Sequence, residues 1–178
     1  MHIFLYIVLK NTKNSMGIII SSFIGCGREY LKNTYGNKVK IFDAVEEIPL
    51  TDVDGATNQD LSEECYNKVM SIVDEYDVVF ISSNKAIRDI FNENGVDYDI
   101  FYPSADRRKE FIENQVRKRT KPNIIRTLDK NFEKWVDEID DDESPNCYKH
   151  KLNNQGEFIG NEPAIMQYIN SVNQNEHS

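Results

Sequence analysis

The chain has 178 residues, a length typical of a single domain with a substantial buried core. Hydrophobic residues make up 39% of the sequence and aromatic residues 11%, a composition that excludes a disordered chain. The formal net charge of −9 argues against a general nucleic-acid binder, because such proteins present a basic face to the phosphates. Three cysteines and three histidines, at spacings unlike those of metal sites, indicate a reduced, cytoplasmic protein without structural zinc.

The first 15 residues precede the first predicted strand of the domain. They form either an N-terminal extension that the domain over residues 16–178 does not need, or an additional edge strand. Their apolar stretch IFLYIVL is too short to span a bilayer, and it lacks the charged start and the cleavage site of a secretory signal. The sequence therefore predicts one domain and no membrane segment.

Apolar runs alternate with helical periodicity along the rest of the chain. The apolar runs predict strands at residues 17–23, 38–44, 77–83, 96–104 and 147–153. The helical spacing predicts helices at residues 28–36, 61–76, 84–95, 106–119, 122–140 and 161–174. Pro49 and Gly55 mark residues 46–60 as a loop. This alternation predicts an α/β fold of three layers, with a parallel sheet of about five strands between helices on both faces.

Ligands of such sheets bind beyond the carboxyl ends of the strands. The predicted strand ends are the turn over residues 21–29, Asp43, residues 82–84 and residues 102–104. We therefore expect these four places to surround one crevice.

The first strand leads into the stretch SSFIGCGREYL, which is typical of a phosphate-binding loop. Such a loop needs glycines, so that backbone N–H groups converge on an anion at a helix N-terminus. Gly25 and Gly27 meet this need, with Cys26 between them. In the standard motif, a lysine for the phosphates and a serine or threonine for magnesium follow, whereas this chain has Arg28 and Glu29.

Two residues of this loop allow more than one interpretation. Glu29 either ligates Mg²⁺ directly, or turns outward and leaves the backbone usable, or merely complements the helix dipole. Cys26 stands at a helix N-terminus, which can lower the pKa of a thiol, but a space-filling role is the favoured interpretation.

Residues 106–126 are rich in lysine and arginine within an otherwise acidic chain. They are a candidate site for a small polyanion. The alternative is a solvated helix face whose charges pair with one another.

The order of these segments resembles a family of short P-loop nucleoside and nucleotide kinases of bacteriophages and bacteria, related to deoxynucleoside monophosphate kinases. The resemblance covers residues 17–152 and is carried by SSFIGCGREYL, KIFDA, DVVFISSNKAIRDIF, GVDYDIFYPSADRRKEFIENQVRKR and IIRTLDKNFEKWV. It implies a P-loop kinase fold with a basic helical lid over residues 104–122. It also implies ATP and Mg²⁺ as cofactors, a small nucleotide as partner, and a host cytoplasm if a phage encodes the protein.

The resemblance also implies roles for single residues. Catalytic roles fall to Arg28, Asp43 and Arg117, and Mg²⁺ would be ligated by Glu29 and Asp43. The nucleotide-binding residues would be Gly25, Cys26, Gly27, Arg28, Glu29, Ser82, Ser83, Arg88, Arg107, Arg108 and Arg119, with Lys109 in the same basic region.

Several positions depart from the family pattern. Ile24 replaces a proline, Asn84 a histidine, Thr120 a glycine, Phe132 a tryptophan and Glu133 an aspartate. The departures gather on the expected catalytic face, so two functions stay open. The first is ATP-dependent phosphoryl transfer to a nucleoside monophosphate or other small nucleotide. The second is a catalytically impaired pseudokinase that binds a nucleotide or a protein. A kinase of a modified base within DNA fits the acidic charge poorly.

Simpler structural roles are the alternative for some residues. Arg88 would pair with Asp89 or Glu93 on its own helix, and Phe132 would be a core contact. His150 has no evident acidic or thiol partner in the sequence, and we expect it to be structural or exposed.

Overall fold

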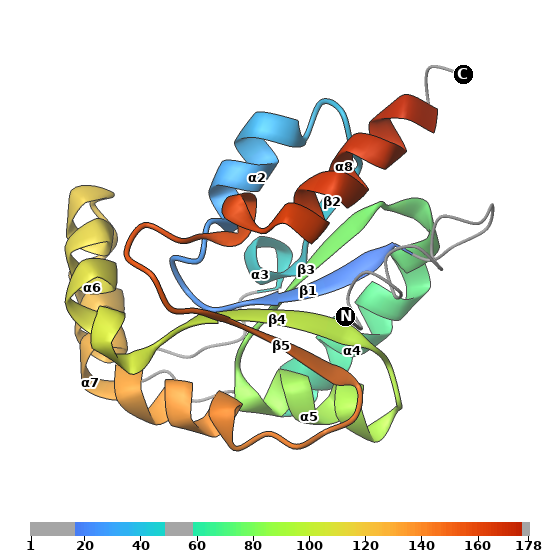
Figure 1. Ribbon diagram of the computed structural model, residues 1–178. Coiled ribbons are helices and arrows are strands. Elements are labelled where there is room, and N and C mark those ends of the chain that lie inside the picture. Colours follow the sequence, from blue (N-terminus) through green and yellow to red (C-terminus); the bar gives the residue numbers. More distant parts are fainter. Residues whose placement is uncertain (1–16, 49–58, 176–178) are drawn as a thin grey trace.

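The computed structural model describes residues 17–48 and 59–175 (Figure 1). The strands are β1 (Ile18–Ser22), β2 (Ile41–Asp43), β3 (Val78–Ser82), β4 (Tyr98–Pro103) and β5 (Cys147–Leu152). The helices are α2 (Arg28–Tyr35), α3 (Ala44–Glu47), α4 (Gln59–Ile72), α5 (Lys85–Glu93), α6 (Arg108–Arg117), α7 (Pro122–Asp140) and α8 (Pro163–Asn175). The predicted N-terminal extension and most of the predicted loop over residues 46–60 lie outside the described residues.

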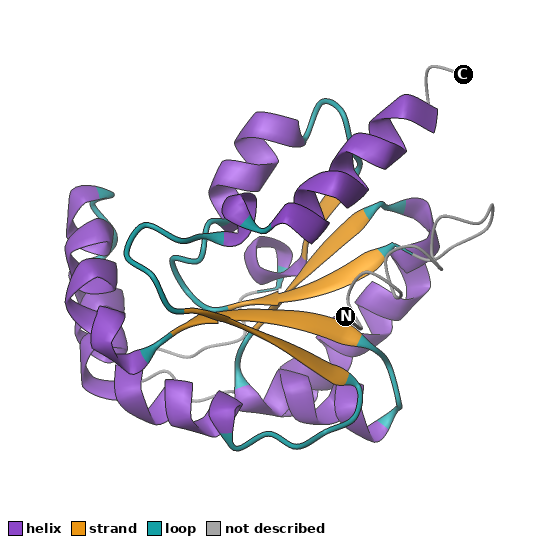
Figure 2. Ribbon diagram, viewed as in Figure 1, coloured by secondary structure: helices purple, strands orange, loops and turns teal. Residues whose placement is uncertain are grey.

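The five strands form one parallel sheet in the order β2-β3-β1-β4-β5. Helices α2 and α8 lie on one face of the sheet, and α4, α5 and α7 on the other (Figures 1 and 2). The predicted α/β class, parallel sheet and helices on both faces are therefore confirmed. None of the helices in the described part of the chain is long and apolar enough to cross a membrane.

Strand β1 is the topological switch point of the sheet. Its neighbours are β3 on one side and β4 on the other, so the chain leaves β1 in one direction and later returns to pair with its opposite edge. Every residue of β1 and β4 is buried, as expected for parallel strands that are covered on both faces. The loop that follows β1 thus opens at the place where α/β sheets bind ligands.

The predicted strands and helices all occur, with ends that differ by a few residues. One α-helix was missed: residues Ala44–Glu47, predicted as a strand end and a loop, form the short helix α3. The reason is helix capping, because the Asp43 carboxylate accepts a hydrogen bond from the Val45 amide at 3.1 Å. The side chain that ends β2 is therefore held by the backbone that follows it.

The last turn of α6 ends in a Schellman motif. Arg119 has a left-handed backbone with φ of 57°, its amide donates to the Val116 carbonyl, and the Thr120 amide donates to the Gln115 carbonyl. The residue with the left-handed backbone is thus Arg119. The glycine of the family pattern corresponds to the next residue, Thr120. This turn fixes the direction in which the chain leaves α6 and enters α7.

Candidate functional site

A cavity of about 570 Å³ lies at the carboxyl edge of the sheet. Its lining comes from the loop between β1 and α2, the end of β3, the start of α5, the last turn of α6 and the helix α7. The apolar part of the lining includes Phe23, Ile124, Leu128 and Trp135. The polar part consists mainly of hydroxyl and amide side chains, with a few charged ones.

At two positions, the loop between β1 and α2 has a backbone conformation that only glycine adopts without strain. Gly25 and Gly27 have φ of 89° and 104°. A Cβ on Gly25 would lie 2.9 Å from Nε2 of Gln115, and one on Gly27 would lie 3.2 Å from Cβ of Phe158. Both glycines are therefore required by conformation and by the close approach of neighbouring segments.

The amides of this loop are open. Among the described residues, the backbone N–H groups of Gly25, Gly27, Arg28 and Glu29 have no hydrogen-bond acceptor, whereas the Cys26 amide donates to the Phe23 carbonyl at 3.1 Å. Gly27 is the N-cap of α2 and supplies no side-chain cap. The start of α2 thus combines free donors with the positive end of a helix dipole, which is the arrangement that binds anions.

The loop is anchored by an aromatic cluster between α6 and α7. The ring of Phe23 packs edge-to-face on Phe111, Phe132 and Trp135, with centroid distances of 6.3, 5.3 and 6.4 Å. Phe132 is fully buried, so its predicted core role is confirmed. The start of the loop is therefore packed against α6 and α7 beside the cavity.

Cys26 turns into the protein interior. Its side chain is 1% exposed, and its carbonyl accepts a hydrogen bond from the Ile159 amide at 2.9 Å. Burial raises the pKa of the Cys26 thiol far above its usual range, against a weaker opposing effect of Arg107. This environment fits a space-filling residue and not a nucleophile.

The two unusual residues of the loop point to different partners. Arg28 Nε lies 3.0 Å from Oδ2 of Asp43, although without the alignment of a hydrogen bond. Lys32 Nζ donates to the same oxygen at 2.9 Å. Glu29 turns outward, with a side chain that is 59% exposed and an Oε2 that lies 3.5 Å from Nζ of Lys118. Glu29 therefore borders the cavity without filling it.

Neither predicted magnesium ligand is free. Asp43 is engaged by two cations and by the α3 amide, and Glu29 is engaged by Lys118. Within residues 17–48 and 59–175, no group of three Asp, Glu, His or Cys side chains lies together as a metal cluster. A magnesium ion normally binds one or two available carboxylates together with water and substrate phosphates. In this arrangement, each of the two predicted ligands would have to give up a cation that it pairs with before it could ligate Mg²⁺.

Ser82 and Ser83 line the cavity, as the topology predicted, together with Asn84 and Lys85 at the start of α5. The Asn84 side chain caps α5 by accepting a hydrogen bond from the Ala86 amide at 2.9 Å. The predicted crevice thus includes the loop after β1 and the end of β3, whereas Asp43 and residues 102–104, also expected there, lie outside its lining.

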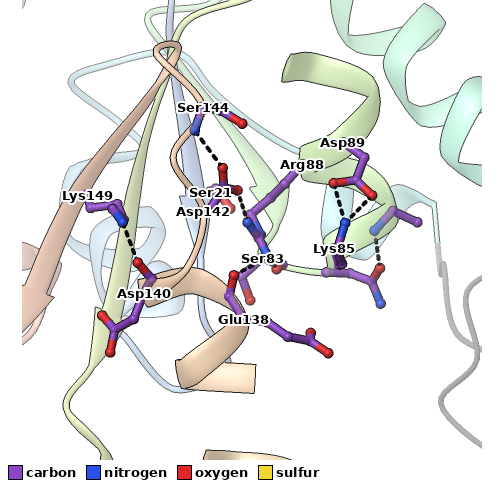
Figure 3. A network of polar contacts seen from close by, with 12 residues as sticks. Ser21, Ser83, Lys85, Arg88, Asp89, Glu138, Asp140, Asp142, Ser144 and Lys149 are labelled. Carbon is purple, nitrogen blue, oxygen red and sulfur yellow. Dashed lines mark hydrogen bonds and ion pairs between the residues drawn. The ribbon is translucent and has the colours of Figure 1, made fainter. Parts of the chain in front are cut away.

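Arg88 lies behind this lining and not in it. Its side chain is 1% exposed and forms an ion pair with Asp142, which follows the end of α7 (Figure 3). Its Nε donates to the Ser83 carbonyl at 3.1 Å, and one terminal nitrogen donates to the Glu138 carbonyl at 3.4 Å. The expected pairing with Asp89 or Glu93 is wrong, because Arg88 lies on the buried face of α5 and Asp89 pairs with Lys85 instead. Arg88 thus holds together two segments of the cavity lining.

Arg107 is likewise internal. It is 4% exposed, and Nε and one terminal nitrogen donate to the two carboxylate oxygens of Glu110 at 2.9 and 2.8 Å. It also donates to the Leu152 carbonyl at 3.2 Å, and its guanidinium lies over the rings of Phe111 and Phe158. The hydrogen bonds from Arg107 outweigh burial and lower the pKa of Glu110. Arg107 therefore ties α6 to the segment after β5.

The other predicted cations of the basic region also lie outside the cavity lining: Arg108, Lys109, Arg117 and Arg119. Arg108 pairs with Asp129 of α7 at 3.0 Å, and Arg117 pairs with Glu113 at 3.9 Å. This arrangement fits the alternative of a solvated helix face with paired charges. The cation of α6 that does border the cavity is Lys118, which no motif singled out.

His150 has an acidic partner, contrary to the expectation from the sequence. Its Nε2 lies 2.7 Å from Oδ1 of the buried Asp99, and its ring stacks on Phe101 at 4.5 Å. The pairing follows from strand register, since Phe101 of β4 lies opposite His150 of β5. The group is structural and lies outside the cavity lining.

No model of a known protein family matches this chain, and no curated protein matches it in sequence.

Replacing Arg88 by methionine should lower the free energy of unfolding by about 3–5 kcal/mol, because it leaves Asp142 buried without its partner. Urea denaturation measures this loss. Arg108→Met is the matched control, and it should cost less than about 1 kcal/mol because its ion pairs are exposed. Equal losses in the two variants would contradict the structural role of Arg88.

Proposed function

We propose that the cavity binds a nucleotide, with the phosphates on the loop between β1 and α2. The observation that carries this proposal is the set of open amides at Gly25, Gly27 and the start of the uncapped α2. A phosphate accepts several such hydrogen bonds at once and complements the helix dipole. The volume of about 570 Å³ lies in the range typical of small-molecule sites.

The rest of the lining suits the nucleoside part of such a ligand. Aromatic and aliphatic side chains, Trp135, Leu128 and Ile124, supply apolar surface for a base. Asn123 and Thr127 add hydrogen-bonding groups on the same helix. This division into a phosphate-binding loop and a mixed apolar and polar wall is what a nucleotide requires.

The reaction that this proposal implies is the one expected from the resemblance to P-loop kinases: transfer of the γ-phosphoryl group of ATP to a small nucleotide. Phosphoryl transfer depends mainly on positioning and on cations around the transferred group. Lys85 and Lys118 border the cavity and would supply that charge. Arg28, predicted as catalytic, would have to leave Asp43 to take part.

A second candidate is supported by the charges of the loop itself. Arg28 is paired with Asp43, and Glu29 with Lys118, so both residues that replace the standard lysine and hydroxyl are engaged by other side chains. A protein with this arrangement would bind a nucleotide without turning it over. It would then be a pseudokinase that acts through nucleotide binding.

Filling the cavity should abolish binding. Thr127→Trp places a large ring into the lining of the cavity and should weaken ADP and ATP at least about tenfold in isothermal titration calorimetry. Lys130→Trp, on the same helix but outside the lining, is the control and should bind as the wild type does. Unchanged affinity in Thr127→Trp, or a wild type that binds no nucleotide, would contradict the proposal.

Restoring the standard residues separates the two candidate functions. In an impaired site, the double variant Arg28→Lys, Glu29→Ser should bind ATP with Mg²⁺ about tenfold more tightly than the wild type, since it regains a lysine and a hydroxyl. A coupled assay with a panel of nucleoside monophosphates measures turnover of both proteins. Turnover by the wild type that the double change abolishes would contradict an impaired site and favour an active kinase.

A further inference from the structure

An ion pair between Glu29 and Lys118 joins the first turn of α2 to the end of α6. The two residues are far apart in sequence, and their charged atoms lie 3.5 Å apart. Both border the cavity, as do Gly25 and Gly27 of the loop. The ion pair therefore borders the same cavity as the open amides on which a phosphate would bind.

The position of Lys118 is fixed by the end of α6. It is the C-cap of that helix, and its amide donates to the Asn114 carbonyl at 3.0 Å. One turn earlier, Gln115 is 5% exposed and approaches Gly25 closely, and its side-chain oxygen accepts a hydrogen bond from the Thr120 hydroxyl at 2.8 Å. The backbone that carries Lys118 is thus packed against the loop.

Lys118 differs from the other cations of the lining in its partner. Arg28 is paired with Asp43, and Lys85 with Asp89, so these two cations are neutralised by carboxylates outside the loop. The partner of Lys118 is Glu29, which belongs to the loop itself and occupies the position of the usual magnesium-ligating hydroxyl. The ammonium thus neutralises a carboxylate in the first turn of α2, the helix whose open amides are proposed to bind the phosphate.

A cation between a phosphate on the loop and Glu29 would reduce the repulsion between these two anions. A divalent ion fulfils this role in the standard loop. An ammonium group carries three N–H donors, so it can hold a carboxylate oxygen and a phosphate oxygen at the same time.

We infer that Lys118 takes the place of Mg²⁺ as the counter-ion of the bound phosphate, so that the site binds metal-free nucleotide polyphosphates. This inference rests on the proposed function. It assigns a ligand class to the site, a nucleotide di- or triphosphate without magnesium, and it explains why a carboxylate is tolerated at position 29. A bound Mg²⁺ would compete with Lys118 for that carboxylate.

Titration calorimetry of the full chain with ADP tests the inference, once in EDTA and once with excess MgCl₂. The wild type should bind ADP in EDTA at least as tightly as with magnesium. Lys118→Met should lose about tenfold affinity or more in EDTA, since it removes the charge that neutralises Glu29. Magnesium should restore much of that loss, because the freed Glu29 carboxylate becomes available to the metal.

Lys130→Met is the matched control. Lys130 lies on α7, is exposed and does not border the cavity, so its loss should change the affinity in neither condition. Glu29→Gln removes the carboxylate and should bind metal-free ADP as tightly as the wild type or more tightly.

Two results would overturn the inference and leave the proposed function intact: a wild type that binds ADP only with magnesium, or a Lys118→Met variant that keeps the metal-free affinity. A wild type that binds ADP in neither condition would overturn both.

Discussion

The backbone at the start of α2 needs an acceptor that no described residue supplies. Gly27 begins the helix without a side-chain cap, and the left-handed Gly25 and Gly27 turn the chain so that consecutive amides stay open. Helix N-termini in folded proteins are satisfied by caps, water or ligands. Here the sheet topology places the open end beside β1, at the switch point, and the aromatic anchor of Phe23 holds it against a cavity. The proposed binding of phosphates follows from this one constraint.

The charges around the cavity act locally. The chain as a whole carries a formal charge of −9, so long-range attraction does not bring an anion to this site. The cations that border the cavity are each held by a carboxylate, as in the pairs of Arg28 with Asp43 and of Lys118 with Glu29. An anion would gain its affinity from the fixed amide dipoles and from the Lys118 ammonium, which would hold the anion and Glu29 together. Nucleotide binding would thus depend mainly on the loop amides, whereas catalytic turnover would also need cations that are now paired with carboxylates.

Most of the fold could be predicted from the sequence, because buried strands and amphipathic helices have distinct periods and the glycine-rich loop has a backbone requirement of its own. The orientation of charged side chains could not. Arg88 and Arg107 look like exposed cations in a sequence, yet both are buried, since their partners come from distant elements. The pairing of His150 with Asp99 depends on the register of β4 and β5. In the sequence, Lys118 stands between Arg117 and Arg119. Only the turn that ends α6 brings Lys118, and not the two arginines, to the lining of the cavity.

The central claim is that the amides of the loop after β1 bind an anion. Amide chemical shifts of the ¹⁵N-labelled full chain, recorded during an ADP titration, test it most directly. The account predicts that the largest changes occur at Gly25, Gly27, Arg28 and Glu29. Saturation with ADP that leaves these four amides unchanged, or the absence of any change up to millimolar ADP, would contradict it.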